Sequence, residues 1–446
     1  MKRKQLIGLC LLALVLTGCG VYRTRAVMPD PRPITKPYSA EPIPADATKL
    51  QSVKGPLTLS RAIILALRKN PGLAAFSYEI REAEARALQA SLYPNPELEV
   101  QLENLGGSGR FGGLNRTETT FQVSQLILLS GLRSKAVRAA AFESDLAAWD
   151  YENEKLNVFV DVRQAFIEVL GAQRSAALNE ELVRLSRQLV KTVSNRVRAG
   201  KMSPAEASRS KVLLAATRID LERARRQLES SRQQLAATWG DSIARFGPVI
   251  GKLDSLPAIP DREKLKALLN QNPVLARFET LLKQRTASVA LEDARGFPNP
   301  VLSGGLRRLN ESDDNAFVVG LSIPLPLSNR NQGSRQEARF ALARTLKEKR
   351  AVEVRLISSL GRVYSELRNA FNEVKVIRNT ILPEAQNAYN IIQDGYLKGR
   401  FNFLDVLDAQ RTLFESRARY LKALISAQLA ETEVERLVAQ EIGSIQ

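Results

Sequence analysis

The chain of 446 residues is written as two similar halves, and this duplication constrains its fold more than any other feature. Residues 57–240 and 261–440 carry the same turn-forming signals in the same order, about 200 residues apart. The matching signals are Asn70–Pro71 and Asn272–Pro273, Tyr93–Pro96 and Phe297–Pro300, and Gly200 with Glu206 and Gly399 with Asp405. A repeat much longer than the roughly 20–50 residues of a solenoid unit indicates a duplicated domain.

Each repeat contains the same predicted series of elements: a helix, two strands, a long helix, a turn and a shorter helix. Apolar and polar residues alternate in four segments, as in strands with one apolar face. The predicted strands are 96–102, 119–127, 301–309 and 316–324, in hairpins at about 96–128 and 299–326. The predicted helices are 58–92, 131–199 and 332–398, the last interrupted at Pro383, with one of about 37 residues after each turn. The predicted fold class is mainly α, with a small membrane β-barrel part.

Four strands in one chain cannot close a barrel, and this limits the oligomeric state. Strands of about 9–11 residues are long enough to cross a bilayer. Phe121 and Val319 lie on the apolar faces and are predicted to contact lipid. An open sheet edge is not tolerated in lipid, because each unpaired backbone group costs several kcal/mol. Several copies must therefore combine their strands: two reach the minimum of about eight, and three give about twelve.

The N-terminus resembles a bacterial lipoprotein signal peptide. A basic start at Lys2–Lys4 precedes the apolar stretch Leu6–Leu16, which is shorter than the about 20 residues that span a bilayer. The sequence Leu16–Cys19 resembles a lipobox. It predicts removal of residues 1–18, acylation of Cys19 and anchoring in outer-membrane lipid.

Proline content marks the segments outside the repeats. Six prolines between residues 28 and 44 predict an extended strap over 19–56. Prolines also predict a linker over 241–260, and residues 441–446 form a C-terminal tail.

Composition excludes several classes of function. The chain has no histidine, and its only cysteines are Cys10 and Cys19, so no Cys/His metal site and no thiol enzyme is expected. Gly107–Gly112 matches G-x-G-x-x-G, but a strand follows it where a dinucleotide site needs a helix. The net charge of +18 is interpreted as solvated helix surface, because basic and acidic residues are interleaved; no nucleic acid and no cofactor is expected.

The chain resembles the TolC-like outer-membrane factors over nearly the whole of its predicted mature length. The run Gly399–Asp408 is similar to the family's periplasmic tip. Two further stretches, 103–120 and 323–333, are most similar to the cobalt–zinc–cadmium resistance subgroup. The resemblance implies a homotrimer in which three protomers share a twelve-stranded barrel on a long α-helical tunnel. It also implies a periplasmic adaptor and an inner-membrane pump of the resistance-nodulation-division type as partners.

The resemblance also implies roles for residues at the two predicted tips, about 196–206 and 395–408. Asp405 and Asp408 match the family's aspartates that narrow the tunnel entrance. Tyr396 and Glu206 match a tyrosine and a carboxylate that link coiled coils in the closed state. In the family an arginine completes this closed-state link, which is called the latch below. The chain departs from the pattern because Phe401 stands at the position of that arginine, and Arg400 or Lys201 are candidate substitutes. Gly200 and Gly399 are expected to end helices and to mark adaptor-docking tips.

The function predicted from these features is a passive outer-membrane channel of a tripartite efflux pump, with heavy-metal cations as one substrate class. An exit duct for drug efflux or type I protein secretion remains an alternative. A periplasmic coiled-coil scaffold, from a different class, has no use for lipid-facing strands. An enzyme has the least support.

Overall fold

The computed structural model describes residues 55–442, which fall into two compact units. The first unit contains Tyr78–Ala148 and Arg277–Glu348, and the second contains the rest of the described chain. Each unit therefore takes segments from both repeats. The predicted signal peptide, Cys19, most of the strap and the last four residues lie outside the described residues.

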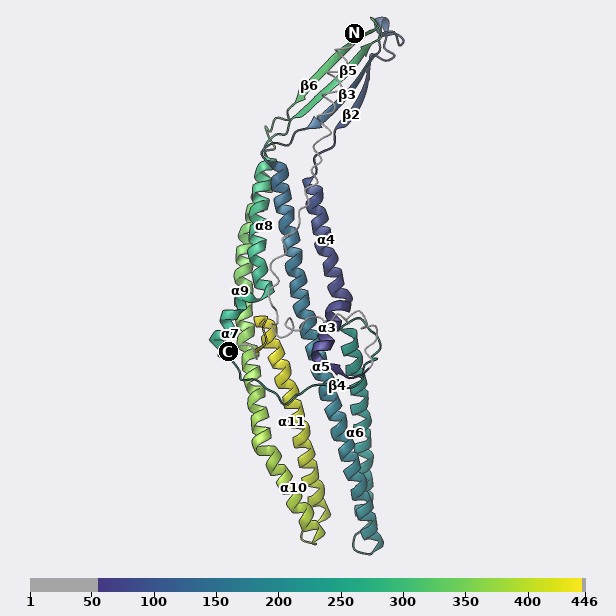
Figure 1. Ribbon diagram of the computed structural model, residues 1–446, viewed down its shortest axis with the longest axis vertical. Helices are drawn as coiled ribbons and strands as arrows, with labels where there is room; N and C mark the ends of the chain where they lie inside the picture. Colours follow the sequence, from purple (N-terminus) through teal and green to yellow (C-terminus); the bar gives the residue numbers. More distant parts are fainter. Residues whose placement is uncertain (1–54, 443–446) are drawn as a thin grey trace. The chain divides into compact units, whose positions relative to one another are not determined.

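The first unit contains one four-stranded antiparallel sheet (Figure 1). Its strands are β2 (Glu97–Glu103), β3 (Glu118–Leu126), β5 (Val301–Leu309) and β6 (Asp314–Ser322), in the order β2-β3-β5-β6. The four predicted strands are confirmed to within two residues. The pairing of β3 with β5 joins the hairpin of one repeat to the hairpin of the other.

The long helices agree with the sequence pattern, including the interruption predicted at one proline. The helices are α5 (Leu132–Arg198), α6 (Pro204–Ala237), α9 (Gln332–Val376), α10 (Leu382–Leu397) and α11 (Phe403–Val438). The predicted interruption at Pro383 is a π-helical turn, η4 (Ile377–Ile381), in which the Leu382 N–H donates to the Ile377 carbonyl. Proline lacks an N–H and clashes with the carbonyl four residues before it, and a wider turn relieves both problems.

The prediction of one helix over 58–92 is wrong, because the chain breaks at Asn70. Two helices form instead, α3 (Leu59–Lys69) and α4 (Pro71–Ser91). A following proline disfavours the helical conformation, and Asn70 is extended with ψ of 119°. Its Oδ1 accepts from the Leu73 N–H at 2.8 Å, and its Nδ2 donates to the Thr238 carbonyl at 2.8 Å.

The second repeat breaks in the same way at Asn272. The elements are α7 (Arg262–Leu268), the 3₁₀ turn η3 (Leu269–Gln271) and α8 (Pro273–Arg295). The Asn272 Nδ2 donates to the Leu437 carbonyl at 3.0 Å. In both repeats this asparagine therefore fastens the break to the end of the last helix of the same repeat.

The segment predicted as a linker, 241–260, is packed into the second unit. It contains β4 (Val249–Ile250), which pairs in parallel with β1 (Leu57–Thr58). Phe246, Val249 and Leu253 are buried in the main hydrophobic core. Gln173 of α5 bonds both backbone groups of Val249, at 2.8 and 3.0 Å. The prolines therefore mark an irregular segment, but one held firmly by burial and side-chain hydrogen bonds.

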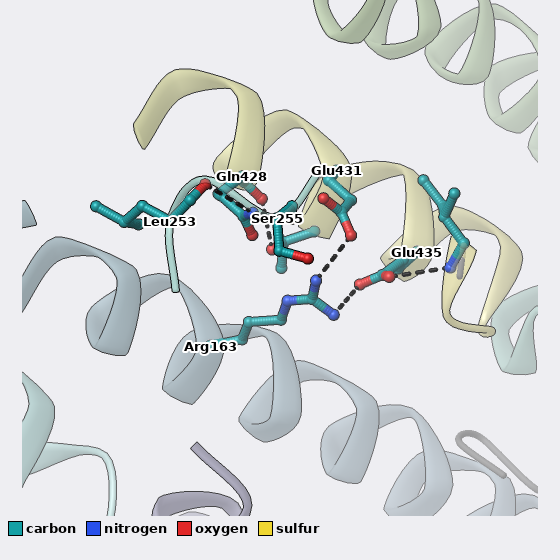
Figure 2. A network of polar contacts seen from close by, with 8 residues as sticks. Arg163, Leu253, Ser255, Gln428, Glu431 and Glu435 are labelled. Atoms are coloured by element: carbon teal, nitrogen blue, oxygen red, sulfur yellow. Dashed lines mark hydrogen bonds and ion pairs between the residues drawn. The ribbon is translucent and has the colours of Figure 1, made fainter. Parts of the chain in front are cut away.

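A buried polar cluster joins α5 to the C-terminal end of α11 in the second unit. Arg163 points from α5 toward two carboxylates on α11 (Figure 2). It pairs with Glu431 at 3.0 Å and with Glu435. The Ile442 N–H donates to the second oxygen of Glu435 at 3.0 Å, so the cluster also holds the turn that ends α11. Within residues 55–442, no helix combines the length and the apolar character needed to cross a bilayer.

Candidate functional site

The first predicted tip is the turn between α5 and α6. Gly200 has a φ of +69°, a conformation that glycine adopts without steric cost. Its N–H donates to the Val197 carbonyl at 2.9 Å, and the Lys201 N–H donates to the Arg196 carbonyl at 2.8 Å. These two bonds are the Schellman pattern, which satisfies carbonyls at a helix end. The predicted role of Gly200 in ending the helix is confirmed.

The second tip, between α10 and α11, repeats this construction. Gly399 has a φ of +74°, and its N–H donates to the Tyr396 carbonyl at 3.1 Å. The Arg400 N–H donates to the Gly395 carbonyl at 2.8 Å. Gly399 therefore ends its helix by the same pair of bonds.

Each turn is followed by a capping box, which explains the repeated spacing of six residues between glycine and carboxylate. In the first tip the Ser203 N–H donates to Glu206 Oε2 at 3.2 Å. In the second, the Asn402 N–H donates to Asp405 Oδ2 at 2.9 Å, and Asn402 Oδ1 accepts from the Asp405 N–H at 3.0 Å. Both carboxylates thus satisfy backbone donors at the start of a helix.

The two tips meet around Tyr396, which is 7 % exposed. Its ring lies in a small apolar cluster with Val193 and Phe403. The Tyr396 hydroxyl donates to Met202 Sδ at 3.3 Å, which links α10 to the first turn. The guanidinium carbon of Arg196 lies 4.5 Å from the centre of the Tyr396 ring, within the range of a cation–π interaction.

The predicted latch residues are placed differently from the family pattern. The Tyr396 hydroxyl bonds Met202, and the Glu206 carboxylate is held in its own capping box. Phe401 covers Gly395, since a Cβ added at that glycine would lie 2.3 Å from the Phe401 ring. Neither Arg400 nor Lys201 forms an ion pair within residues 55–442. No sequence signal points to Arg196, because it lies in the long helix α5 and not in the turn.

The predicted entrance carboxylates lie on the first turns of α11. Asp405 is half-buried and bonds backward to Asn402, whereas Asp408 is exposed and pairs forward with Arg411 at 3.0 Å. Both side chains of the Asp408–Arg411 pair are about 70 % exposed, so the pair contributes little to stability. Asp408 is therefore the more available of the two carboxylates. The role of Tyr396, Glu206, Asp405 and Asp408 in a gate stays a prediction.

The sheet of the first unit has one apolar face that is continuous across all four strands. One register row contains Val100, Phe121, Leu306 and Phe317, and the next contains Leu98, Val123, Gly304 and Val319. These apolar side chains are exposed, with Phe317 at 88 % and Val319 at 80 %. An exposed apolar face of this size is typical of a surface that contacts a membrane or another protein. The edge strands β2 and β6 each pair on one side only within the described chain.

The opposite face of the sheet is polar. Arg307 of β5 pairs with Glu118 at 3.0 Å and with Glu103 at 3.1 Å, and its Nε donates to Thr120 Oγ1 at 3.0 Å. Glu97 and Glu99 continue this face along β2. Charged residues on one face and apolar residues on the other suit a sheet between lipid and water. Among residues 55–442, no group of three or more Asp, Glu, Cys or His side chains is placed to hold a metal ion.

Known proteins with this arrangement are outer-membrane channels. A family model described as outer membrane efflux protein matches residues 62–241 and 265–440. The cobalt-zinc-cadmium resistance protein CzcC of Cupriavidus metallidurans is 34 % identical over 386 residues, which cover 86 % of this chain and 91 % of CzcC. The solved structure of the outer membrane protein VceC of Vibrio cholerae aligns with a TM-score of 0.71 at 17 % identity, covering 86 % of this chain and 96 % of VceC.

The open-state MtrE outer membrane channel of Neisseria gonorrhoeae also aligns with a TM-score of 0.71 at 17 % identity, covering 87 % of this chain and 90 % of MtrE. The solved structures share the fold, and the family match spans both repeats. The chain belongs to the outer membrane efflux protein family.

Proposed function

We propose that this protein is the passive outer-membrane exit duct of a tripartite pump for heavy-metal cations. Three copies form the duct, a periplasmic adaptor docks at the two tips, and an inner-membrane transporter of the resistance-nodulation-division type supplies the energy. The sheet carries the proposal, because its apolar face runs across four strands that have two unpaired edges. Such edges persist in lipid only when further strands pair with them.

The trimer is tested by placing a charge on the apolar face. Phe121→Arg and Val319→Arg each put a guanidinium where lipid is expected, at a cost of about 2–4 kcal/mol per site near the bilayer midplane. Gln122→Arg is the matched control, because Gln122 neighbours Phe121 in sequence but lies on the polar face. We expect light scattering in detergent to show a trimer for wild type and Gln122→Arg, and loss of trimer for the other two. A monodisperse wild-type monomer contradicts the shared barrel.

Heavy-metal cations are proposed as cargo because CzcC is named a cobalt-zinc-cadmium resistance protein. A deletion strain should become sensitive to cobalt, zinc and cadmium and regain resistance when the gene is returned. Unchanged metal resistance with new sensitivity to dyes or antibiotics would instead favour drug efflux, the alternative drawn from the sequence.

The anchor and the entrance have separate tests. Cys19→Ser should prevent lipid labelling, and normal labelling of this variant contradicts the proposed acylation.

The double variant Asp405→Ala with Asp408→Ala should remove block of the channel by multivalent cations in planar bilayers, because rings of carboxylates select and bind cations. Wild-type block in the double variant would place the constriction elsewhere.

A further inference from the structure

Much of the net charge of the chain is concentrated at one of the two tips. Residues 182–211, around the first turn, contain eight basic residues and one carboxylate, a net charge of +7. The matching residues 381–410, around the second turn, contain two basic residues and four carboxylates, a net charge of −2. Both turns use the same backbone bonds, so the turn itself does not require basic residues.

The basic side chains of the first tip form no ion pairs with carboxylates in the part of the chain that the structure describes. Seven of the eight are exposed and form no ion pair within residues 55–442: Arg184, Arg187, Lys191, Arg198, Lys201, Arg209 and Lys211. Farther along α6, Arg223 pairs with Asp220 at 3.1 Å, and Arg225 pairs with Glu180 of α5 at 2.9 Å. Some cations farther along α6 therefore have carboxylate partners, whereas the seven exposed cations of the first tip have none among the described residues.

The spacing of these cations works against the stability of α5. Arg184, Arg187 and Lys191 follow one another at three and four residues, which places them on one helix face. Like charges at these spacings destabilise a helix. Since the arrangement does not serve the fold, a negatively charged surface outside the protomer accounts for it better.

An exposed face of α6 has apolar residues at the spacing of a helix-binding seam. Val212 and Ile219, seven residues apart, are 69 % and 62 % exposed. Lys211 and Arg218 directly precede them in the sequence and are also exposed. Apolar residues at heptad spacing with flanking charges are the pattern by which one helix selects another.

We infer that the α5–α6 tip docks an acidic α-helical partner. The partner's apolar side chains cover Val212 and Ile219, and its carboxylates face the unpaired cations. This inference rests on the proposed function, in which the partner is a helical segment of the periplasmic adaptor. A second copy of this chain supplies too little negative charge, because its own second tip has a net charge of only −2.

The probes are two synthetic helical hairpins with identical apolar heptad positions, one flanked by glutamate and one by lysine. Fluorescence anisotropy measures their binding to the purified full-length protein in detergent. We expect the glutamate hairpin to bind and the lysine hairpin not to bind. Binding should weaken by about tenfold or more between about 0.1 M and 1 M salt, because the Debye length falls from about 10 Å to 3 Å.

Charge reversal locates the binding surface. The triple variant Arg187→Glu, Lys191→Glu and Lys201→Glu should lose binding of the glutamate hairpin by about tenfold or more and gain binding of the lysine hairpin. The control Lys264→Glu, Lys347→Glu and Lys375→Glu has the same change in net charge at exposed lysines outside both tips and should bind as wild type.

Three results would overturn the inference. The first is equal binding of both hairpins to the wild-type protein. The second is a loss of binding in the control as large as that in the triple variant. The third is dissociation of the triple variant into monomers, which would show that a second copy of the chain covers the basic surface. If the triple variant does not fold, the inference is still tested by the binding of the two hairpins to the wild-type protein and by the salt dependence of that binding. A wild-type protein that is not a trimer contradicts the proposed function, whereas an intact trimer without charge-selective binding contradicts only this inference.

Discussion

The two ends of α11 use carboxylates in opposite ways. At its start, Asp405 caps the helix and Asp408 forms an exposed pair with Arg411. At its end, Glu431 and Glu435 are 5 % and 3 % exposed and share Arg163 of α5 (Figure 2). Residues of the same kind, on one helix, therefore differ in energetic importance because of burial. A buried ion pair that loses one partner leaves an uncompensated charge, whereas an exposed pair leaves a hydrated one.

Removal of the central cation should have the largest effect. Arg163→Met leaves Glu431 and Glu435 buried without their cation, and we expect a loss of about 3–5 kcal/mol of stability. Arg411→Met removes the exposed pair at the other end and should change stability by less than about 0.5 kcal/mol. Urea unfolding of the purified protein, followed by helical circular dichroism, measures the difference. Equal effects of the two variants would contradict the assigned importance of burial.

The buried end should also respond to pH. Burial raises the pKa of Glu435 from 4.5 to about 7, although Arg163 opposes this shift, and burial also raises the pKa of Glu431. Because the folded-state pKa of Glu435 exceeds the unfolded value, its contribution to stability is fully present below pH 4.5 and is lost as pH rises to about 7. The loss is at most about 3 kcal/mol.

Glu435→Gln tests this pH dependence, because the amide does not titrate. We expect the variant to show a flatter profile of unfolding midpoint between pH 4.5 and 8 and to be more stable relative to wild type at pH 8 than at pH 5. Asp408→Asn, at the exposed end, should keep the wild-type slope. A wild-type profile without any decline above pH 5 would contradict the raised pKa.

The start of α11 should show moderate effects that depend on backbone geometry. Asn402→Ala removes the cap on the Asp405 N–H and should cost about 1 kcal/mol. Gly399→Ala forces a side chain into a positive φ and should cost about 1–2 kcal/mol. Gly333→Ala is a suitable control, because Gly333 lies in α9 without a positive φ and with open space at its Cβ position. If Gly333→Ala destabilises the protein as much as Gly399→Ala, the turn geometry is not the cause.

The hydroxyl of Tyr396 should have the smallest effect. Tyr396→Phe removes its bond to Met202 Sδ, a weak acceptor, but keeps the ring beneath Arg196. We expect a change below about 0.5 kcal/mol in unfolding. Arg196→Gln, which removes the cation over the ring, should cost about 0.5–1 kcal/mol. A larger effect of Tyr396→Phe than of Arg196→Gln would indicate that the hydroxyl has a stronger partner, such as Glu206, in the assembled protein.

Features that depend on residues close together in the chain could be predicted from the sequence. Alternation placed the four strands, because side chains point to opposite faces of a strand. Glycine followed six residues later by a carboxylate marked both tips, because a positive φ and a capping box are local requirements. The Asn-Pro pairs at Asn70 and Asn272 mark matching points of the two repeats. A proline also disfavours a helical conformation at the residue before it, so the break at Asn70 is a local effect that the prediction of one continuous helix over 58–92 does not include.

The energetic importance of the polar residues could not be predicted from the sequence, because it depends on packing between segments far apart in the chain. Arg163 meets Glu431 and Glu435 across separations of 268 and 272 residues, and no local pattern distinguishes them from charges on solvated faces. The same holds for Arg196 over Tyr396 and for the burial of Val249 in a proline-rich segment. The physical reason is that the strength of a charge or a hydrogen bond depends on its desolvation, and desolvation is set by the segments that pack around it.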